Sequence, residues 1–96
     1  MSRFEDHCAE SLRIFGEAFE NVHLWLDELA GTPEYGFHHR RKRHHEAGIR
    51  EAADLFGDGA QEAARGHVIS DLKEEGWTES DRLPIDESDY VRLGLF

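Results

Sequence analysis

Histidine and aspartate recur at helical spacing in this sequence. Seven of the 96 residues are histidines, and two of them, His23 and His67, are each followed four residues later by an aspartate, Asp27 and Asp71. Residues four apart lie one above the other on a helix, so each pair can present an imidazole and a carboxylate on one surface. Neutral imidazole and carboxylate are common ligands for Zn, Fe, Mn or Ni in helical bundles. The two pairs therefore predict a site for a divalent transition metal.

Four more histidines flank a basic block, which reads His38-His39-Arg40-Arg41-Lys42-Arg43-His44-His45. On one continuous helix successive residues turn by about 100°, and His45 then shares the inward face with the apolar residues of the segment. His44 borders the opposite side of that face, whereas His39 and Arg43 point outward. The sequence therefore predicts a set of metal ligands in which His45 and His67 are the first choices: His23, Asp27, His44, His45, His67 and Asp71.

The cations of the block affect this prediction in two opposite ways. They would repel a metal ion if they faced it, but they would also keep neighbouring histidines neutral and able to bind a metal. Guanidinium groups match phosphate oxygens through paired hydrogen bonds. We therefore expect Arg40 and Arg43 to contact a small anionic or phosphorylated ligand, with hydrolysis of such a substrate as the chemistry that a nearby metal would support. The sequence does not name a reaction.

Simpler interpretations of the same residues stay open. Each His-Asp pair could be a buried hydrogen bond that ties two helices together, and the cations could be a solvated helix face that balances the surrounding acid. A non-catalytic helical protein that forms a homodimer through a polar interface is the alternative function. Nucleic-acid binding through the basic block is less favoured, because the formal net charge is −10 and no aromatic residues interleave the cations.

Composition limits the class of protein. A chain of 96 residues with 39% hydrophobic residues is expected to fold as one domain, residues 1–96. Cys8 is the only cysteine, which excludes an intramolecular disulfide and a CxxC metal site. Charged residues throughout the first twenty positions and the lack of a long apolar run argue against a secretory signal and a membrane span. We expect a soluble cytoplasmic protein.

The charged residues are strongly biased toward acid. Asp and Glu number 21, against 11 Lys and Arg, of which only Lys42 and Lys73 are lysines. This balance resembles that of proteins adapted to molar salt inside the cell, where the screening length falls to roughly 3 Å and repulsion between carboxylates is suppressed. The composition therefore favours a halophilic protein over an ordinary acidic one.

Apolar residues at spacings of three and four divide the chain into helical segments. The expected helices are residues 3–15, with an apolar stripe of Phe4, Cys8, Leu12 and Phe15, then 17–29, 34–56 and 61–75. The tail from Trp77 is expected to end in a short helix or an extended segment. No stretch alternates with a period of two. The sequence therefore predicts an all-α fold, a small three- or four-helix bundle with a short C-terminal tail.

These motifs together resemble a family of small bacterial and phage proteins of unknown function. Its central helix carries a Phe-x-His-Arg-x-x-Arg-His-His segment, then a glycine and a closing Phe-Gly, similar to Phe37 through His45 with Gly48 and Phe56-Gly57 here. The remaining matches are His23, Trp25, Asp27, His67, Asp71, Leu72, Pro84, Asp89 and Tyr90. In this chain the connection from Phe56-Gly57 to His67 is shorter, and Arg41-Lys42 replaces a less polar pair. The resemblance includes His39 among the matching positions and implies a grouping, not a mechanism.

Overall fold

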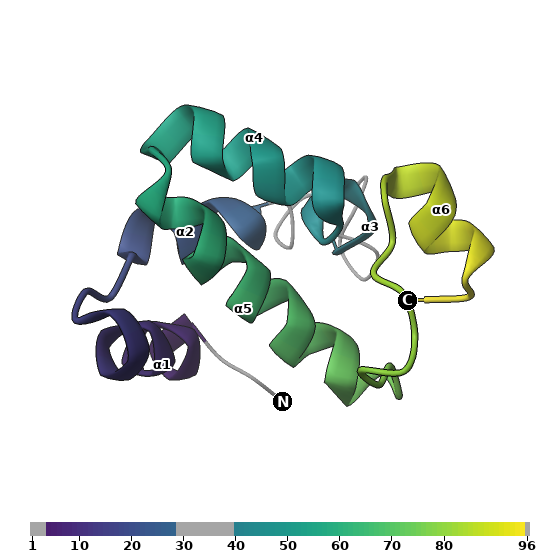
Figure 1. The fold of residues 1–96 in the computed structure, drawn as a ribbon, viewed down its shortest axis with the longest axis horizontal. Coiled ribbons are helices and arrows are strands. Elements are labelled where there is room, and N and C mark those ends of the chain that lie inside the picture. The colour runs from purple at the N-terminus through teal and green to yellow at the C-terminus, as the bar shows by residue number, and fades with distance from the viewer. Residues whose placement is uncertain (1–3, 29–39, 96) are drawn as a thin grey trace.

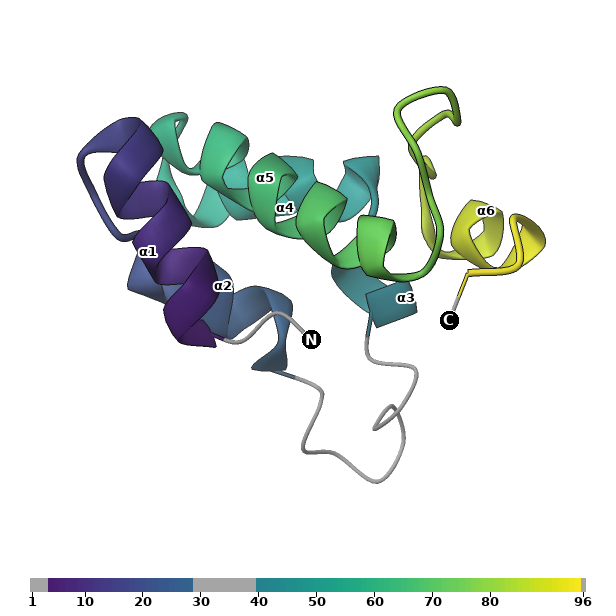
Figure 2. The same ribbon diagram turned by 90° about the horizontal axis from the view of Figure 1, so that it is seen from below.

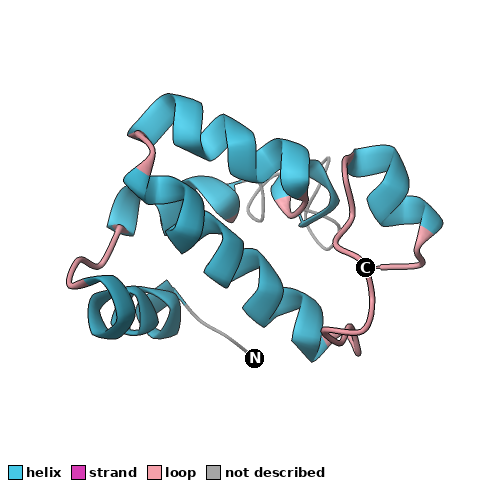
Figure 3. Ribbon diagram, viewed as in Figure 1, coloured by secondary structure: helices cyan, strands magenta, loops and turns pink. Residues whose placement is uncertain are grey.

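The protein is an assembly of helices in the computed structural model, which describes residues 4–28 and 40–95. The helices are α1 (Phe4–Phe15), α2 (Glu20–Leu26), α3 (Arg40–Arg43), α4 (Glu46–Phe56), α5 (Gly59–Glu74) and α6 (Glu87–Arg92). Helices and loops account for all of the described residues, and none of these residues forms a strand (Figures 1 and 3). The predicted all-α fold is confirmed, with α3 and α6 only 4 and 6 residues long. None of the helices in the described part is long and apolar enough to cross a membrane.

Helix α5 is the centre of the fold. It packs against α1, α2 and α4, and the chain reverses between α4 and α5 at Gly57, whose φ of 100° suits glycine. Figure 2 shows α1 and α2 side by side at one end of the molecule and α6 at the other. The apolar core lies between these helices and consists of Val22, Trp25, Leu26, Ile49, Ala52, Ala60, Ala64, Val68, Leu72 and Tyr90.

Helix α1 turns a different face to the interior from the one its apolar residues predict. The expected helix is present, but Leu12 and Phe15 are 56% and 42% exposed. The buried residues of α1 are His7 and Ser11, which lie one turn apart. The expected apolar stripe is therefore wrong at Leu12 and Phe15, whereas Phe4 and Cys8 are half-buried.

The long helix expected over residues 34–56 is interrupted in its described part. Helix α3 ends at Arg43, and α4 begins at Glu46 after His44 and His45. His45 is extended, with φ −158° and ψ 177°, and its Nδ1 accepts a hydrogen bond from the backbone N–H of Gly48. This is the geometry of a helix N-cap. Residues 34–39, which include His38 and His39, lie outside the described residues.

Two further contacts fix this break between α3 and α4. The first two N–H groups of α4, from Glu46 and Ala47, donate to the carbonyl groups of Pro84 and Ile85 in the tail. A Cβ atom at Gly48 would overlap the backbone carbonyl of Arg43, so the chain passes closely over itself here. The tail then forms α6, the short helix that was one of its two expected forms, and α6 packs against α3. These contacts determine the directions in which His44 and His45 point.

Candidate metal centre

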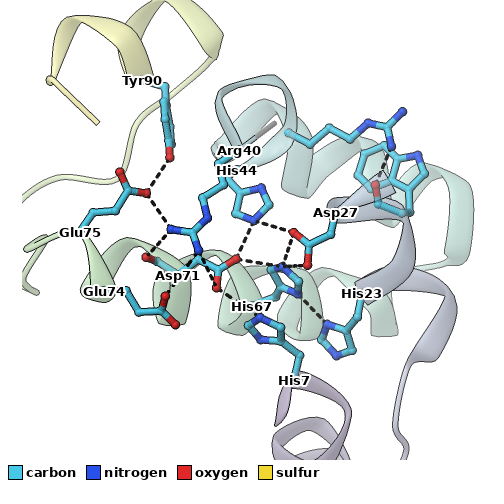
Figure 4. A network of polar contacts seen from close by, with 12 residues as sticks. His7, His23, Asp27, Arg40, His44, His67, Asp71, Glu74, Glu75 and Tyr90 are labelled. Carbon is cyan, nitrogen blue, oxygen red and sulfur yellow. Dashed lines mark hydrogen bonds and ion pairs between the residues drawn. The ribbon is translucent and has the colours of Figure 1, made fainter. Parts of the chain in front are cut away.

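The two His-Asp pairs of α2 and α5 meet inside the protein (Figure 4). The Nδ1 atoms of His23 and His67 lie 2.9 Å apart. On the other side of the same ring, Nε2 of His67 lies 3.4 Å from both carboxylate oxygens of Asp27 and 3.2 Å from Oδ2 of Asp71. His23, His67 and Asp71 are each at least 98% buried. The structure thus brings together side chains that are 44 residues apart in sequence.

A row of apolar residues lies directly beside each polar pair. On a helix, adjacent residues point about 100° apart. Residues i and i+4 can therefore face one environment while residues i+1 and i+5 face another. The rows that enter the apolar core are Val22 and Leu26 on α2, and Val68 and Leu72 on α5. The four polar residues are therefore positioned by the same helices that build the core.

His7 joins these pairs from α1. Its ring stacks on that of His67 with centroids 3.7 Å apart and an interplanar angle of 19°. Its Nε2 lies 3.2 Å from Oδ1 of Asp71. Sequence reasoning missed His7 because no aspartate follows it at helical spacing and because it lies beside the apolar stripe of α1. Its spacing of four from Ser11 was the available signal for a polar inward face.

Asp71 is the hub of the site. Besides His7 and His67, its carboxylate contacts Nε2 of His44, which lies 2.9 Å from Oδ2. Burial by itself raises the pKa of Asp71, but the three surrounding imidazoles outweigh burial and bring the pKa well below its ordinary range. Asp71 is therefore a buried carboxylate that stays ionised. We use the name polar cluster for His7, His23, Asp27, His44, His67 and Asp71.

Asp27 forms the edge of the polar cluster that reaches solvent. Its side chain is 33% exposed, whereas the side chains of His44, His67 and Asp71 are at most 3% exposed. Its carboxylate lies 3.5 Å from Nε2 of His44 as well as close to His67. Burial lowers the pKa of His67, but the carboxylates of Asp27 and Asp71 outweigh burial and raise it above its ordinary value. A small molecule or ion would therefore approach the polar cluster past Asp27.

The adjacent histidines at the α3–α4 break point to different places. His44 reaches the polar cluster and is fully buried, although the helical wheel put it at the border of the inward face. His45 is also buried, but its Nδ1 caps α4 instead of facing the carboxylates. The helical wheel assumed a continuous helix. Because the helix breaks here, His44 and not His45 reaches the carboxylates.

Two of the histidines are held in the neutral form. Burial is the main cause that lowers the pKa of His23 to about 4, with the nearby His67 and His7 adding to it. Burial also lowers the pKa of His44 to about 4, against the opposing effect of Asp71. A neutral imidazole has a free lone pair, which is the state that binds a metal or accepts a hydrogen bond.

The two arginines expected to bind an anion contact groups of the protein itself. Arg40 donates to Glu75 at 3.0 Å and to the backbone carbonyl of Asp71 at 3.2 Å, and its guanidinium lies 3.5 Å from Glu74. Arg43 lies over the ring of Trp25 at 4.2 Å and donates to the Trp25 carbonyl at 2.6 Å. An anion-binding role for Arg40 and Arg43 stays a prediction.

Two overlapping sets of side chains have the spacing of metal ligands. In the first set, His7, Asp27, His67 and Asp71, each residue offers a ligand atom within 4.8 Å of all the others. The second set, which meets the same limit, contains three imidazoles, those of His7, His23 and His67. Since metal–ligand bonds are about 2.0 to 2.2 Å long, atoms this close can surround one ion with small adjustments. His44 and His45 belong to neither set.

Comparison with known proteins identifies the family and nothing more specific. No curated protein and no solved structure matches this chain. The model of a family described as a domain of unknown function, DUF6915, matches residues 2–91. This confirms the expected membership of an uncharacterised family, and the match includes every helix of the fold up to Val91 in α6. The chain belongs to the DUF6915 family.

Proposed function

We propose that this protein binds a divalent transition metal through His7, Asp27, His67 and Asp71. The two histidines direct their Nε2 atoms toward the carboxylate of Asp71, at 3.2 Å each. Asp27 completes the set from the solvent side, 3.4 Å from His67. Two imidazoles and two carboxylates are a donor set suited to Zn, Fe, Mn or Ni.

One observation carries the proposal. Nε2 of His7 and Oδ1 of Asp71 are buried and face each other at 3.2 Å without the geometry of a hydrogen bond, and the Arg40 guanidinium lies 3.7 Å from the same oxygen. A buried polar atom left without a hydrogen bond costs about 1 to 3 kcal/mol. A metal ion between these two atoms would bind both of them at once.

Charge favours the set with carboxylates over the set of three imidazoles. Asp27 and Asp71 supply two negative charges, which neutralise a divalent cation in a buried place, whereas His7, His23 and His67 supply none when neutral. Without an ion, each imidazole nitrogen that contacts a carboxylate needs a proton to donate. A bound divalent ion would take the place of these protons. The ion is therefore expected on the Nε2 side of His67, next to Asp71.

His44 has a supporting role in this proposal. Its Nε2 lies 2.9 Å from Oδ2 of Asp71, so a proton on Nε2 would be donated to the carboxylate. Hydrogen bonds of this kind orient metal-binding carboxylates, and their loss typically lowers metal affinity roughly 10- to 100-fold. We assign His44 to the orientation of Asp71 and His45 to the capping of α4.

Asp27, whose side chain is 33% exposed, marks the side from which a substrate would approach the proposed ion. Four protein ligands would leave open positions on an ion that prefers six, as Fe, Mn and Ni commonly do, and fewer on Zn. Hydrolysis of an anionic or phosphorylated substrate is the chemistry expected from the sequence, and it stays a prediction. Homodimer formation and the less favoured binding of nucleic acid also stay predictions.

The metal is tested by elemental analysis and calorimetry of untagged protein. We expect near-stoichiometric metal after purification with metal present, and the affinity for Zn²⁺ or Mn²⁺ should fall by more than the roughly 100-fold of an outer-shell change in His7→Gln and His67→Gln. His45→Gln is the comparison variant: it removes a buried imidazole that lies outside both sets and acts only through the cap of α4, so its affinity should fall by no more than an outer-shell change. Trace metal in the wild type, or equal losses in all three variants, would refute the proposal.

A further inference from the structure

A chain of buried polar contacts leads away from the metal centre through His23 to Ser11. Nε2 of His23 lies 2.7 Å from Oγ of Ser11, and Nδ1 of His23 lies 2.9 Å from Nδ1 of His67. Ser11, His23 and His67 are 3%, 1% and 1% exposed. They come from α1, α2 and α5, so the chain joins three helices of the metal centre. Figure 4 shows the contact between His23 and His67.

The proton positions along this chain follow from the proposed function, on which this inference rests. If the ion binds Nε2 of His67, the remaining proton of that neutral ring is on Nδ1. This N–H must then donate to Nδ1 of His23, which has to be unprotonated. A neutral His23 consequently has its own proton on Nε2, and that N–H donates to Oγ of Ser11. With the ion on Nε2 of His67, only this arrangement gives each of the two contacts one donor and one acceptor; the reverse arrangement would need the proton of His67 on Nε2.

We propose that His23 and Ser11 are positioning residues, which set the tautomer and orientation of His67 for metal binding through Nε2 and do not bind the metal themselves. A metal-binding histidine usually donates its second ring N–H to an acceptor, most often a carboxylate, a carbonyl or water. In this protein the acceptor is a neutral imidazole, and the Ser11 hydroxyl, by accepting from Nε2–H, satisfies the other nitrogen of that ring and fixes its orientation. The metal-facing side of His67 therefore depends on a serine that lies on another helix.

Nuclear magnetic resonance of the histidine rings tests the proton positions directly. In zinc-loaded wild-type protein labelled with ¹⁵N, we expect His67 to have a protonated Nδ1 and a zinc-bound Nε2. His23 should have a protonated Nε2 and an unprotonated Nδ1 that is not bound to zinc. A proton on Nδ1 of His23, or zinc bound to Nδ1 of both His23 and His67, would overturn the assignment. The second result would instead place the ion among the three imidazoles.

Zinc affinity gives an independent measure. Ser11→Ala removes the acceptor for His23 and should weaken zinc binding by about tenfold, at the lower end of outer-shell effects. Val22→Ala is the matched control, since Val22 is buried beside His23 on α2 but belongs to the apolar core. It should lower the melting temperature of the metal-free protein at least as much as Ser11→Ala and leave zinc affinity unchanged. Equal affinities of Ser11→Ala and wild type would refute the positioning role.

The two proposals fail in different ways in these experiments. If wild-type protein binds no zinc, the metal centre itself is refuted, and the positioning role falls with it. If wild-type protein binds zinc through His67 and Asp71 but His23 has its proton on Nδ1, only the positioning role is refuted. The ring spectra and the affinity of Ser11→Ala therefore separate the two outcomes.

Discussion

The apolar core and the polar cluster are two buried regions that share the same helices but depend on their residues differently. Val68 and Leu72 enter the core from α5, and His67 and Asp71 enter the polar cluster from the next row of the same helix. A core side chain contributes through the apolar area it removes from water, about 1.5 to 3 kcal/mol for a residue such as Leu. A side chain of the polar cluster is favourable only while its partners remain.

This difference indicates why the polar cluster is present. Replacing a buried ionic group together with its partners by apolar residues is often neutral or stabilising, whereas removing one partner alone is strongly destabilising. A protein selected only for stability would therefore gain little from the four buried histidines of the polar cluster. The proposed metal ion would give a reason to keep them, and the variants below test whether the two regions respond to metal differently.

Asp71→Asn is expected to have the largest effect. It leaves His7, His44 and His67 without their shared carboxylate, so the free energy of unfolding of metal-free protein should fall by about 3 to 5 kcal/mol. At a free zinc concentration of 100 times the Kd, the free energy of unfolding of wild-type protein should rise by about 2.7 kcal/mol. The free energy of unfolding of Asp71→Asn should not rise at that concentration. Urea denaturation with and without zinc measures both quantities. An unchanged gain from zinc in this variant would contradict the ligand role of Asp71.

Leu72→Ala changes the neighbouring residue, which lies in the apolar core. Truncation of a fully buried leucine lowers the free energy of unfolding by about 2 to 5 kcal/mol, and the small alanines around α5 favour the lower part of that range. The gain from zinc should equal that of wild-type protein, because no ligand is touched. Thermal denaturation with zinc and with a chelator checks this. Loss of the zinc gain here would mean that the two regions are not separable.

Gly48→Ala tests the break that directs His44 into the polar cluster. The added methyl group would overlap the carbonyl of Arg43, so α3 or α4 has to shift, at a cost of about 1 to 3 kcal/mol. Because the shift displaces His44 from Asp71, zinc affinity should also fall, by less than in Asp71→Asn. Calorimetry and denaturation measure the two effects. Stability lost with full zinc affinity would show that His44 does not support the metal centre.

Asp89→Asn is expected to have the smallest effect and none on zinc. The Arg82 guanidinium, followed by the Ile85 N–H at 2.9 Å, holds the pKa of Asp89 below its ordinary range. The stability that this contributes is present above the ordinary Asp pKa of about 3.9 and is lost as the pH falls through the lower folded-state pKa. Denaturation from pH 7 to pH 2 should therefore show wild type and variant converging in acid. A constant difference would contradict the assignment.

Helical spacing in the sequence indicated many of the residues that build the apolar core and the polar cluster. Pairs four residues apart, such as His67 with Asp71 and Val68 with Leu72, follow from helical geometry alone, and so do the all-α fold and most helix boundaries. Sequence reasoning missed His7 because a single histidine has no partner in its own helix. Its partners, Asp71 and His67, are on α5, more than half the chain away.

The assignment of His44 and His45 required information that lies far away in the chain. Local periodicity favoured one helix through both residues. The break depends instead on the carbonyl groups of Pro84 and Ile85, which satisfy the first N–H groups of α4, and on the close passage of Gly48 over Arg43. Such long-range contacts have no signature in a helical wheel, so the wheel favoured His45 over His44 for the site.

The adjacency of polar and apolar rows on α5 makes this helix intolerant of insertions. One residue added between Ala64 and His67 would rotate everything after it by about 100°. His67 would then occupy the place of Val68 in the core, and Asp71 that of Leu72. A charged group would enter the apolar core, and the proposed metal centre would lose two ligands at once. Length variation among relatives is therefore expected in the connections between helices and not within α5.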